Sequence, residues 1–354
     1  MNTLRLSVDP SRRETAEARE AIARAAGILR SGGLVALPTE TVYGLGANAL
    51  DAAAVARIFA AKERPSWDPI IVHIAGPTAP NPMIEKLVTE IPEPARKLME
   101  AFWPGPLTLL LPRSSEVPDL VTAGRPLVGV RMPSHPVAFA VIQLAGVPIA
   151  APSANTFSRT SPTTAGHVLE DLDGRIDAVL DAGPTDHGLE STVLDPCQSP
   201  MVIYRPGAIS AGQICSVAGP VEIYRPDAPL AAEPRGALPA PGVGLRHYAP
   251  RARLILIEST LADLPARIRE AAAEQPGERL GMMLPSELAP HAPPDAEVFP
   301  WGRLSVPEEM ARSLYAGLRT LDGIGCTVVL CPVPPGDGIS AAIRDRLRKA
   351  SSGK

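Results

Sequence analysis

Residues 15–37 read TAEAREAIARAAGILRSGGLVAL, and this stretch indicates the class of the fold. Its first part repeats apolar side chains at the spacing of one helical face, at Ile22, Ala25, Ala26 and Leu29. Gly32 and Gly33 follow, at the point where a helix over residues 15–31 is expected to end. The next four residues, LVAL at 34–37, form a short apolar run that predicts a buried strand. A helix followed by a buried strand is typical of an α/β protein.

The same alternation of helix and strand patterns continues to about residue 205. Apolar runs predict strands at 70–74, 107–111, 127–132, 147–151, 177–181, 191–195 and 201–205. Amphipathic stretches predict helices at 52–62, 94–102, 136–145 and 163–172. The last two strands are predicted to be neighbours in an open sheet.

Residues 225–250, RPDAPLAAEPRGALPAPGVGLRHYAP, interrupt this rhythm with a high density of Pro, Ala and Gly. Such a composition is typical of a stiff, extended linker between domains. His247 and Tyr248 lie side by side near its end, which also indicates a segment that docks on the protein. Beyond it, strands are predicted at 254–258, 280–284 and 327–331, and helices at 261–274, 307–321 and 339–349. The chain therefore has enough residues for a second, small α/β domain.

The composition of the 354 residues excludes several classes of protein. The net charge of −4 disfavours a general nucleic-acid coat protein, which is usually basic. Pro and Gly make up 70 of 354 residues (41 and 29), below the roughly 25–30% of low-complexity chains. There is no apolar run of about 18 residues, and the first 25 residues are too charged for a secretory signal. The four cysteines lack CxxC or zinc-site spacing, so we expect a cytoplasmic protein without disulfides or a structural metal, and no membrane partner.

Familiar nucleotide-binding motifs are absent or badly placed. Residues 44–49, GLGANA, fit the dinucleotide pattern G-x-G-x-x-A, but that pattern should follow its strand immediately. Here PTETVY separates it from LVAL at 34–37, which argues against a dinucleotide site. The chain also contains no P-loop motif and no G-x-S-x-G motif of hydrolases.

What remains is a set of polar side chains in loops near strand ends, where open α/β sheets bind ligands. They are Thr39, Glu40, Thr41, Tyr43, Lys62, Arg64, His73, Arg131, Ser153, Asn155, Ser161, Glu190, Ser191, Thr192 and Arg205. Taken singly, the cations read as surface charges, His73 as a satisfied core histidine, and Ser153 and Asn155 as turn formers. Taken together, the cations could clamp phosphates or carboxylates. The residues by themselves thus predict an α/β protein with a candidate anion site.

Longer strings of sequence carry a resemblance to a known family. They are SGGLVALPTETVYGLGANAL, AKERPSWDPIIVHI, FWPGPLTLLLP, VGVRMPSHP, PIAAPSAN, SPTTAGHV, LDAGPTDHGLESTVLDP, IYRPGAI and PGVGLRHYAP. In this order they closely resemble the YrdC-like family, and with its tail domain the chain is similar to the long form, the threonylcarbamoyl-AMP synthases. The resemblance implies a YrdC-like catalytic domain with a twisted open sheet over 1–212, a Pro/Gly-rich linker over 213–250 and a Rossmann-like α/β domain over 251–354.

The resemblance also implies a reaction. Members of this family are nucleotidyltransferases that combine L-threonine, bicarbonate and ATP, with Mg²⁺ on the ATP, into threonylcarbamoyl-AMP and pyrophosphate. A separate transferase complex then passes the threonylcarbamoyl group to an adenosine next to the anticodon of certain tRNAs. Weak contact with RNA is a further expectation.

Matching positions imply the site residues. Those expected to contact ATP are Lys62, Arg64, Asp68, Ser153, Asn155, Ser161, Arg205 and Tyr248. Those expected around threonine and the carbamate are Thr39, Thr41, His73, Arg131, Ala151 and Ser191. Lys62, Arg64, His73 and Arg131 are expected to be catalytic, and no residue is expected to bind a metal. The linker is expected to close over the pocket as a lid through His247 and Tyr248.

The chain departs from the family pattern at a few positions. Glu63 stands between Lys62 and Arg64, and Asp68 replaces an amide, which can change the contacts to the nucleotide. Residues 156–158 also differ from the usual loop.

Two other functions remain open. An RNA-binding module would need a basic face, and a carbamoyltransferase of the hydrogenase-maturation type would need acylphosphatase and zinc-finger segments, which the sequence does not show.

Overall fold

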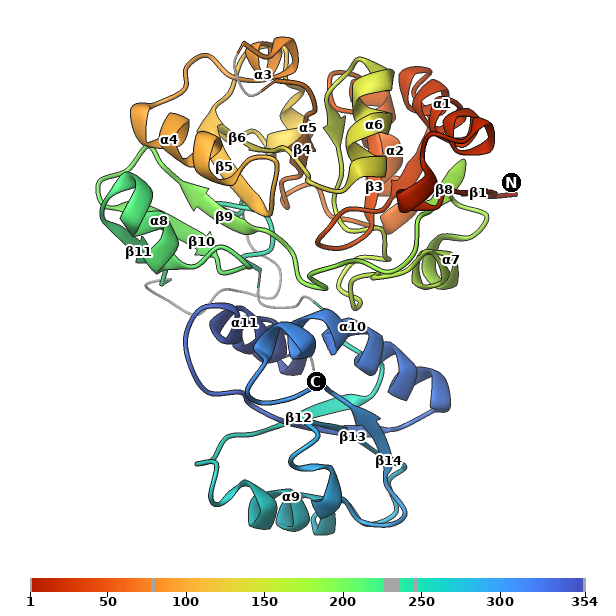
Figure 1. Cartoon of the computed structure of the whole chain (residues 1–354), viewed down its shortest axis with the longest axis vertical. Helices are drawn as coiled ribbons and strands as arrows, with labels where there is room; N and C mark the ends of the chain where they lie inside the picture. Colours follow the sequence, from red (N-terminus) through yellow and green to blue (C-terminus); the bar gives the residue numbers. More distant parts are fainter. Residues whose placement is uncertain (1, 78–79, 226–235, 245–247, 353–354) are drawn as a thin grey trace.

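The computed structural model describes residues 2–77, 80–225, 236–244 and 248–352, and these residues form two separate sheets (Figure 1). We refer to the parts built on them as the N-terminal and C-terminal domains. The larger sheet is mixed and open, with strands in the order β1 (Leu4–Ser7), β8 (Ala178–Asp181), β2 (Val35–Leu37), β3 (Gly44–Asn48), β7 (Ile149–Ala150), β4 (Ile71–His73), β6 (Leu127–Arg131), β5 (Leu107–Pro112), β9 (Thr192–Asp195), β10 (Met201–Arg205) and β11 (Val221–Ile223).

Helices cover both faces of this sheet. In chain order they are α1 (Ala16–Arg30), α2 (Ala52–Lys62), α3 (Pro82–Leu87), α4 (Glu93–Phe102), α5 (Asp119–Thr122), α6 (Pro136–Ala145), α7 (Ala165–Leu172) and α8 (Ala211–Ala218), with a 3-10 turn at Pro10–Arg12. The predicted helices at 52–62 and 136–145 are confirmed at these bounds. The helix predicted at 15–31 begins after Thr15, whose side chain accepts a hydrogen bond from the backbone N–H of Ala18 as an N-cap.

The smaller sheet is entirely parallel, in the order β12 (Arg253–Ile257), β15 (Val328–Pro332), β13 (Leu280–Leu284) and β14 (Glu297–Pro300). Its helices are α9 (Leu264–Ala273), α10 (Pro307–Ile324) and α11 (Ile339–Ser351), with a 3-10 turn at Ala289–His291. In Figure 1, α9 lies on the far side of this sheet, and α10 and α11 lie between it and the N-terminal domain. The α/β class predicted for both parts is confirmed.

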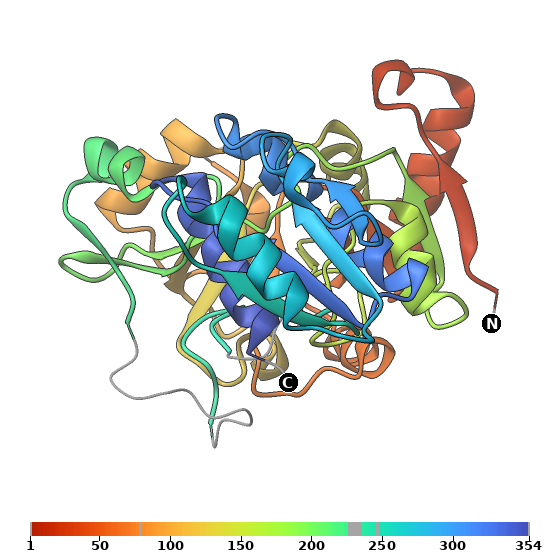
Figure 2. The ribbon, with the colours of Figure 1, turned by 90° about the horizontal axis from the view of Figure 1, so that it is seen from below.

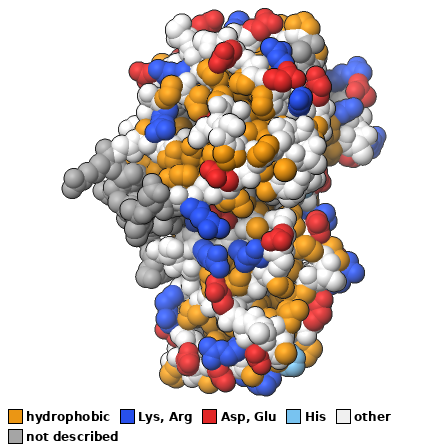
Figure 3. All heavy atoms as spheres, turned by 90° about the vertical axis from the view of Figure 1, so that its left-hand side faces the viewer, with side chains coloured by type: hydrophobic (Ala, Val, Ile, Leu, Met, Phe, Trp, Pro, Cys, Tyr) orange, Lys and Arg blue, Asp and Glu red, His pale blue; other side chains and the backbone are white. Residues whose placement is uncertain are grey.

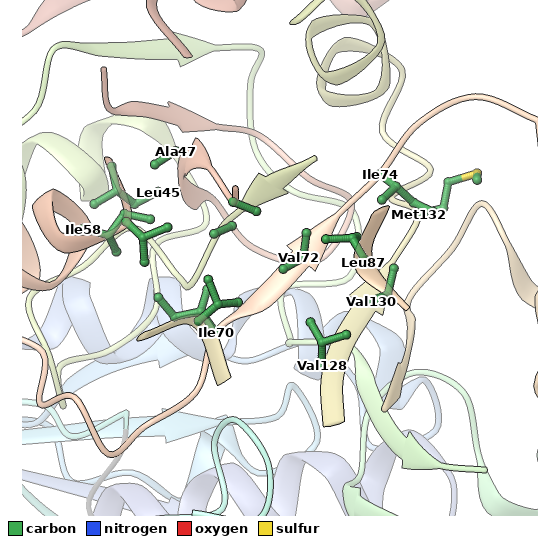
Figure 4. Close-up of a cluster of buried hydrophobic side chains, with 14 of the residues drawn as sticks. Leu45, Ala47, Ile58, Ile70, Val72, Ile74, Leu87, Val128, Val130 and Met132 are labelled. Carbon is green, nitrogen blue, oxygen red and sulfur yellow. The ribbon is translucent and has the colours of Figure 1, made fainter. Parts of the chain in front are cut away.

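Two apolar clusters hold the N-terminal domain together, one on each face of its sheet. Alternate residues of a strand point to opposite faces, so Ala36 joins one cluster while Val35 and Leu37 join the other. Figure 4 shows part of the first cluster, where Ile58 of α2 and Val72 of β4 lie among the labelled side chains. Helices α1 and α6 supply the second. The strand ends that carry the polar loops are therefore fixed from both sides.

The segment Gly44–Asn48 forms strand β3 and not a phosphate-binding turn. It pairs antiparallel with β2, with Val35 opposite Gly46, and then with β7. A side chain at Gly46 would meet Ile149 at 3.0 Å and the carbonyl of Val35 at 3.2 Å, so this glycine allows the close approach of the strands. The argument against a dinucleotide site is thereby supported.

The predicted neighbouring strands at 191–195 and 201–205 do pair, antiparallel, as β9 and β10. Residues 221–223 then add β11 beside β10.

The domain bounds at residues 212 and 250 stay predictions. None of the helices in the described ranges is both long and apolar enough to cross a membrane.

Candidate active site

A pocket lies where the ends of several strands of the larger sheet meet. Register brings its parts together: His73 at the end of β4 lies opposite Arg131 at the end of β6, and Gly44 forms an isolated bridge with Ser153. Ten of the residues expected from the sequence line this pocket: Thr39, Thr41, Arg64, His73, Arg131, Ala151, Ser153, Ser191, Arg205 and Tyr248. Side chains from far-apart loops thus share one cavity.

Four expected residues lie behind the pocket wall. The Lys62 ammonium donates to the backbone carbonyls of Ser153 and Asn155, both at 2.5 Å. The Asn155 amide in turn donates to two further loop carbonyls. Asp68 forms an ion pair with Arg64 at 2.9 Å, and Ser161 donates to Glu190 at 2.6 Å. Whether these side chains touch a nucleotide stays a prediction, but they hold the loops that line the pocket.

One side of the pocket is organised by Arg131. Its guanidinium forms a 2.6 Å ion pair with Glu40, donates to the Thr41 hydroxyl at 2.9 Å and donates to the carbonyl of Gly105. Burial alone would raise the pKa of the Glu40 carboxyl, but Arg131 more than offsets this and holds it below its ordinary value. Arg131 is thus a fixed positive group beside the hydroxyls of Thr39 and Thr41.

His73 is buried and also lines the pocket, so it is more than a core histidine. Burial, and then the positive charge of Arg131, lowers the pKa of His73 to about 3. Its Nδ1 atom has no hydrogen-bond partner among the described residues. At neutral pH the imidazole is therefore uncharged, with a ring nitrogen available to a ligand.

The opposite side of the pocket carries Arg64 and Arg205. Arg64 donates to the carbonyl of Pro69 at 2.8 Å besides pairing with Asp68. Arg205 donates to the carbonyl of Ser191 at 3.0 and 3.1 Å and to its hydroxyl at 3.2 Å. These contacts fix two cations on the wall that faces the linker.

The described part of the linker is docked on this wall. Leu238, Ala240 and Val243 are buried, and the backbone N–H of Leu238 donates to the carbonyl of Trp67 at 3.0 Å. Gly242 has φ +74°, and a side chain there would meet Arg205 at 2.9 Å and the Tyr248 hydroxyl at 3.0 Å. These linker residues are therefore docked on the pocket wall, and closure of the linker as a lid stays a prediction.

Tyr248 closes one side of the pocket. Its ring is 5.6 Å from that of Tyr315, and the guanidinium of Arg346 lies 5.3 Å from its centre. Burial, with the nearby Glu190, raises the pKa of Tyr248 to about 12, so its hydroxyl stays protonated. His247 lies outside the described residues.

The assignments to ATP and threonine left out two carboxylates, Glu40 and Glu190, which the sequence had placed among the polar loop candidates. Glu190 lines the pocket, and Glu40 neutralises Arg131 from behind. Each is adjacent in sequence to expected contact residues, Glu40 between Thr39 and Thr41 and Glu190 before Ser191. An acidic residue inside a polar strand-end loop was the available signal.

Comparison with known proteins shows the family of the chain. Residues 27–207 match the family model for Sua5, YciO and YrdC proteins, described as "Telomere recombination", and residues 209–352 match a model described as "Threonylcarbamoyl-AMP synthase, C-terminal domain". Similar curated proteins include threonylcarbamoyl-AMP synthases of Pyrococcus abyssi (44% identity, covering 92% of this chain and 93% of that protein) and Bacillus subtilis (43%, covering 94% and 93%). A solved structure of P. abyssi Sua5 complexed with L-threonine aligns with a TM-score of 0.85 at 40% identity, covering 99% of this chain and 98% of that one. Since both models match in sequence order and these relatives align over nearly their whole length, the chain belongs to the Sua5/YciO/YrdC family, in its two-domain threonylcarbamoyl-AMP synthase form.

Proposed function

We propose that the chain catalyses the reaction of its family: L-threonine, bicarbonate and ATP give threonylcarbamoyl-AMP and pyrophosphate. The observation that carries this proposal is the convergence of three arginines on one pocket from separate elements. Arg64 follows the end of helix α2, and Arg131 and Arg205 end strands β6 and β10. Both reacting partners are anions, so bringing them together requires positive groups that offset their repulsion.

The chemistry has two steps. The uncharged amine of threonine adds to the carbon of bicarbonate or CO₂, which gives a carbamate with loss of water or a proton. A carbamate oxygen then attacks the α-phosphorus; the new P–O bond forms as the bond to pyrophosphate breaks. Holding three reactants in one geometry supplies much of the acceleration.

The two sides of the pocket suit the two substrates. Arg131, with Thr39 and Thr41, faces the space where a threonine carboxylate and hydroxyl would be bound. Since His73 is neutral and its pKa is lowered to about 3, it is a weak base, and its part is to orient the amine through a ring nitrogen rather than to provide positive charge.

Arg64, Arg205, Ser153 and Tyr248 face the nucleotide side, and Lys62, Asn155 and Ser161 keep the loops of that side in place. Mg²⁺ would arrive on the triphosphate, whose charge it partly neutralises. The nearby carboxylates fit this arrangement, because Asp68 and Glu190 are both engaged with arginines, and no cluster of three metal-binding side chains occurs in the described ranges.

The decisive experiment measures pyrophosphate release from ATP with threonine and bicarbonate added singly and together. We expect release only when both are present, and release independent of threonine would contradict the proposal. Arg131→Met should raise the KM for threonine about tenfold or more, whereas the exposed Arg57→Met should change it little.

We further propose that the product passes to a separate tRNA-modifying transferase and that the chain works in the cytoplasm, where tRNA is found. Figure 3 shows Lys and Arg side chains gathered on one face at the junction of the two domains, which is where we place a weak contact with RNA. Binding to RNA should then be weak and should fall steeply with added salt. RNA binding that does not change with salt would contradict this placement.

A further inference from the structure

The C-terminal domain contacts the wall of the pocket at the carboxylate of Glu190. Figures 1 and 2 show α10 and α11 packed against the N-terminal domain on the side of its strand-end loops. From these helices, the Tyr315 hydroxyl donates to Glu190 at 3.0 and 3.1 Å, and Arg346 forms an ion pair with Glu190 at 2.8 Å. Glu190 itself lines the pocket.

Glu190 also receives a hydrogen bond from the N-terminal domain. Its Oε1 accepts from the Ser161 hydroxyl at 2.6 Å and from Tyr315, while its Oε2 accepts from Arg346 and Tyr315. Glu190, Ser161, Tyr315 and Arg346 are all buried. The carboxylate is thus fully engaged, and the groups on α10 and α11 set both its charge balance and its orientation.

The same arginine supports the linker side of the pocket. Besides pairing with Glu190, Arg346 lies under the Tyr248 ring at 5.3 Å and donates to the carbonyl of Pro206 at 3.0 Å. One turn along α11, Lys349 donates to the carbonyl of Gly242 at 2.9 Å. One face of α11 therefore contacts both Glu190 and the docked linker.

The charge balance has a direct consequence for an anionic ligand. Without Arg346, the buried negative charge of Glu190 would be offset only by the more distant charge of Arg205. Such a charge on the wall of a pocket that has to accept a polyphosphate repels the ligand at low dielectric. We infer that Arg346 and Tyr315, although they belong to the C-terminal domain, are positioning residues for the nucleotide side of the pocket and act through Glu190. This inference rests on the proposed function, which supplies ATP as the anion.

A contact that only holds the two domains together predicts a different effect of its loss on the two KM values. Loss of adhesion lowers stability and affects both substrates alike. Loss of positioning raises the KM for ATP and leaves the KM for threonine nearly unchanged, because the threonine side is built around Arg131.

The test uses the full chain with Arg346→Met, and Arg348→Met on the exposed face of the same helix as the matched control. We expect R346M to raise the KM for ATP about tenfold or more and the KM for threonine less than about threefold, with R348M unchanged. The double variant E190Q/R346M, which removes both charges, should recover most of the affinity for ATP.

The outcomes are distinguishable. If the unmodified chain shows no threonine-dependent release of pyrophosphate, the proposed function is wrong, and the inference fails with it. If the chain is active but R346M and R348M have equal KM values for ATP, or if E190Q/R346M binds ATP no better than R346M, only the inference is overturned. Should R346M not fold, Tyr315→Phe is the deciding variant, because it keeps the ring and removes the hydroxyl that donates to Glu190. A KM for ATP raised about threefold supports the inference, and an unchanged KM refutes it.

Discussion

Lys62, Arg131 and Arg205 are almost completely buried, and each is held by oxygen atoms of the protein. Lys62 has a structural role, because its ammonium donates to two carbonyls of the loop that carries Ser153. Burial, and then the charge of Arg64, lowers the pKa of Lys62 well below its ordinary value. The residue thus shapes the pocket loop from within the core.

Lys62→Met should therefore destabilise the protein. It leaves the carbonyls of Ser153 and Asn155 without their buried donor, which costs about 2–4 kcal/mol of the free energy of unfolding. Urea unfolding measures this loss. Lys97→Met, at an exposed ion pair on α4, is the control and should change stability by less than about 0.5 kcal/mol. Equal stabilities of the two variants would contradict the assigned role.

His73 predicts a dependence of stability on pH. Its pKa of about 3 in the folded state lies below the ordinary value of 6.5, so between these values the unfolded chain binds the additional proton. The contribution of His73 to the free energy of unfolding is therefore fully present above about pH 6.5. It decreases as the pH falls, by about 2 kcal/mol between pH 7 and pH 5. His73→Asn should lose less stability over that interval in urea unfolding. Parallel pH profiles for the two proteins would show that His73 is not held neutral.

The linker shows how an element with little regular structure can still be fixed. Its apolar side chains are buried beside Ile71 of β4 and Val193 of β9, and Gly242 fits between Arg205 and Tyr248. At this point the backbone adopts a positive φ, and no space remains for a side chain.

Gly242→Ala should displace the linker from the pocket and raise the KM for ATP about tenfold. Gly124→Ala is a matched control, because Gly124 has φ +75° but open space around the added methyl group. Both variants should lose about 1 kcal/mol from backbone strain, whereas only G242A should affect ATP. An unchanged KM in G242A would mean that the docked segment does not shape the nucleotide side.

At the scale of the whole molecule, buried ion pairs join the two domains. Besides the contact at Glu190, Arg319 of α10 pairs with Asp171 and Glu170 of α7 at 2.9 Å and donates to the carbonyl of Thr160 at 2.6 Å. The two sheets are therefore linked by directional contacts as well as by packing.

Arg319→Met should lower the free energy of unfolding by about 1–3 kcal/mol, because the carbonyl of Thr160 loses a donor and Asp171 keeps only Arg159. Trp103 and Trp301 report on the two domains by fluorescence during urea unfolding. The control is Arg279→Met, at an exposed pair within the C-terminal domain, with an expected change below about 0.5 kcal/mol. A loss in R319M no larger than in R279M would remove the case for coupling through this contact.

The sequence by itself determined the class of the fold and most of its elements, because helical and strand periodicity is a local property. The helices at 52–62 and 136–145 and the strand at 201–205 follow from spacing alone. Short or exposed strands such as β1, β11 and β14 gave no such signal, since a few exposed residues carry little periodicity. Family strings in the sequence also singled out ten of the residues that line the pocket.

Only the tertiary structure decided which of these polar side chains face the cavity and which hold its walls. Lys62 and Ser161 carry the same chemistry as pocket residues, but their orientation depends on loop carbonyls and on Glu190, which approach them only in the folded chain. The contact from Arg346 to Glu190 joins residues 156 positions apart, and no local pattern encodes such a distance. Buried charge pairs between domains depend on the fold, because only the folded chain brings both groups out of water at the same place.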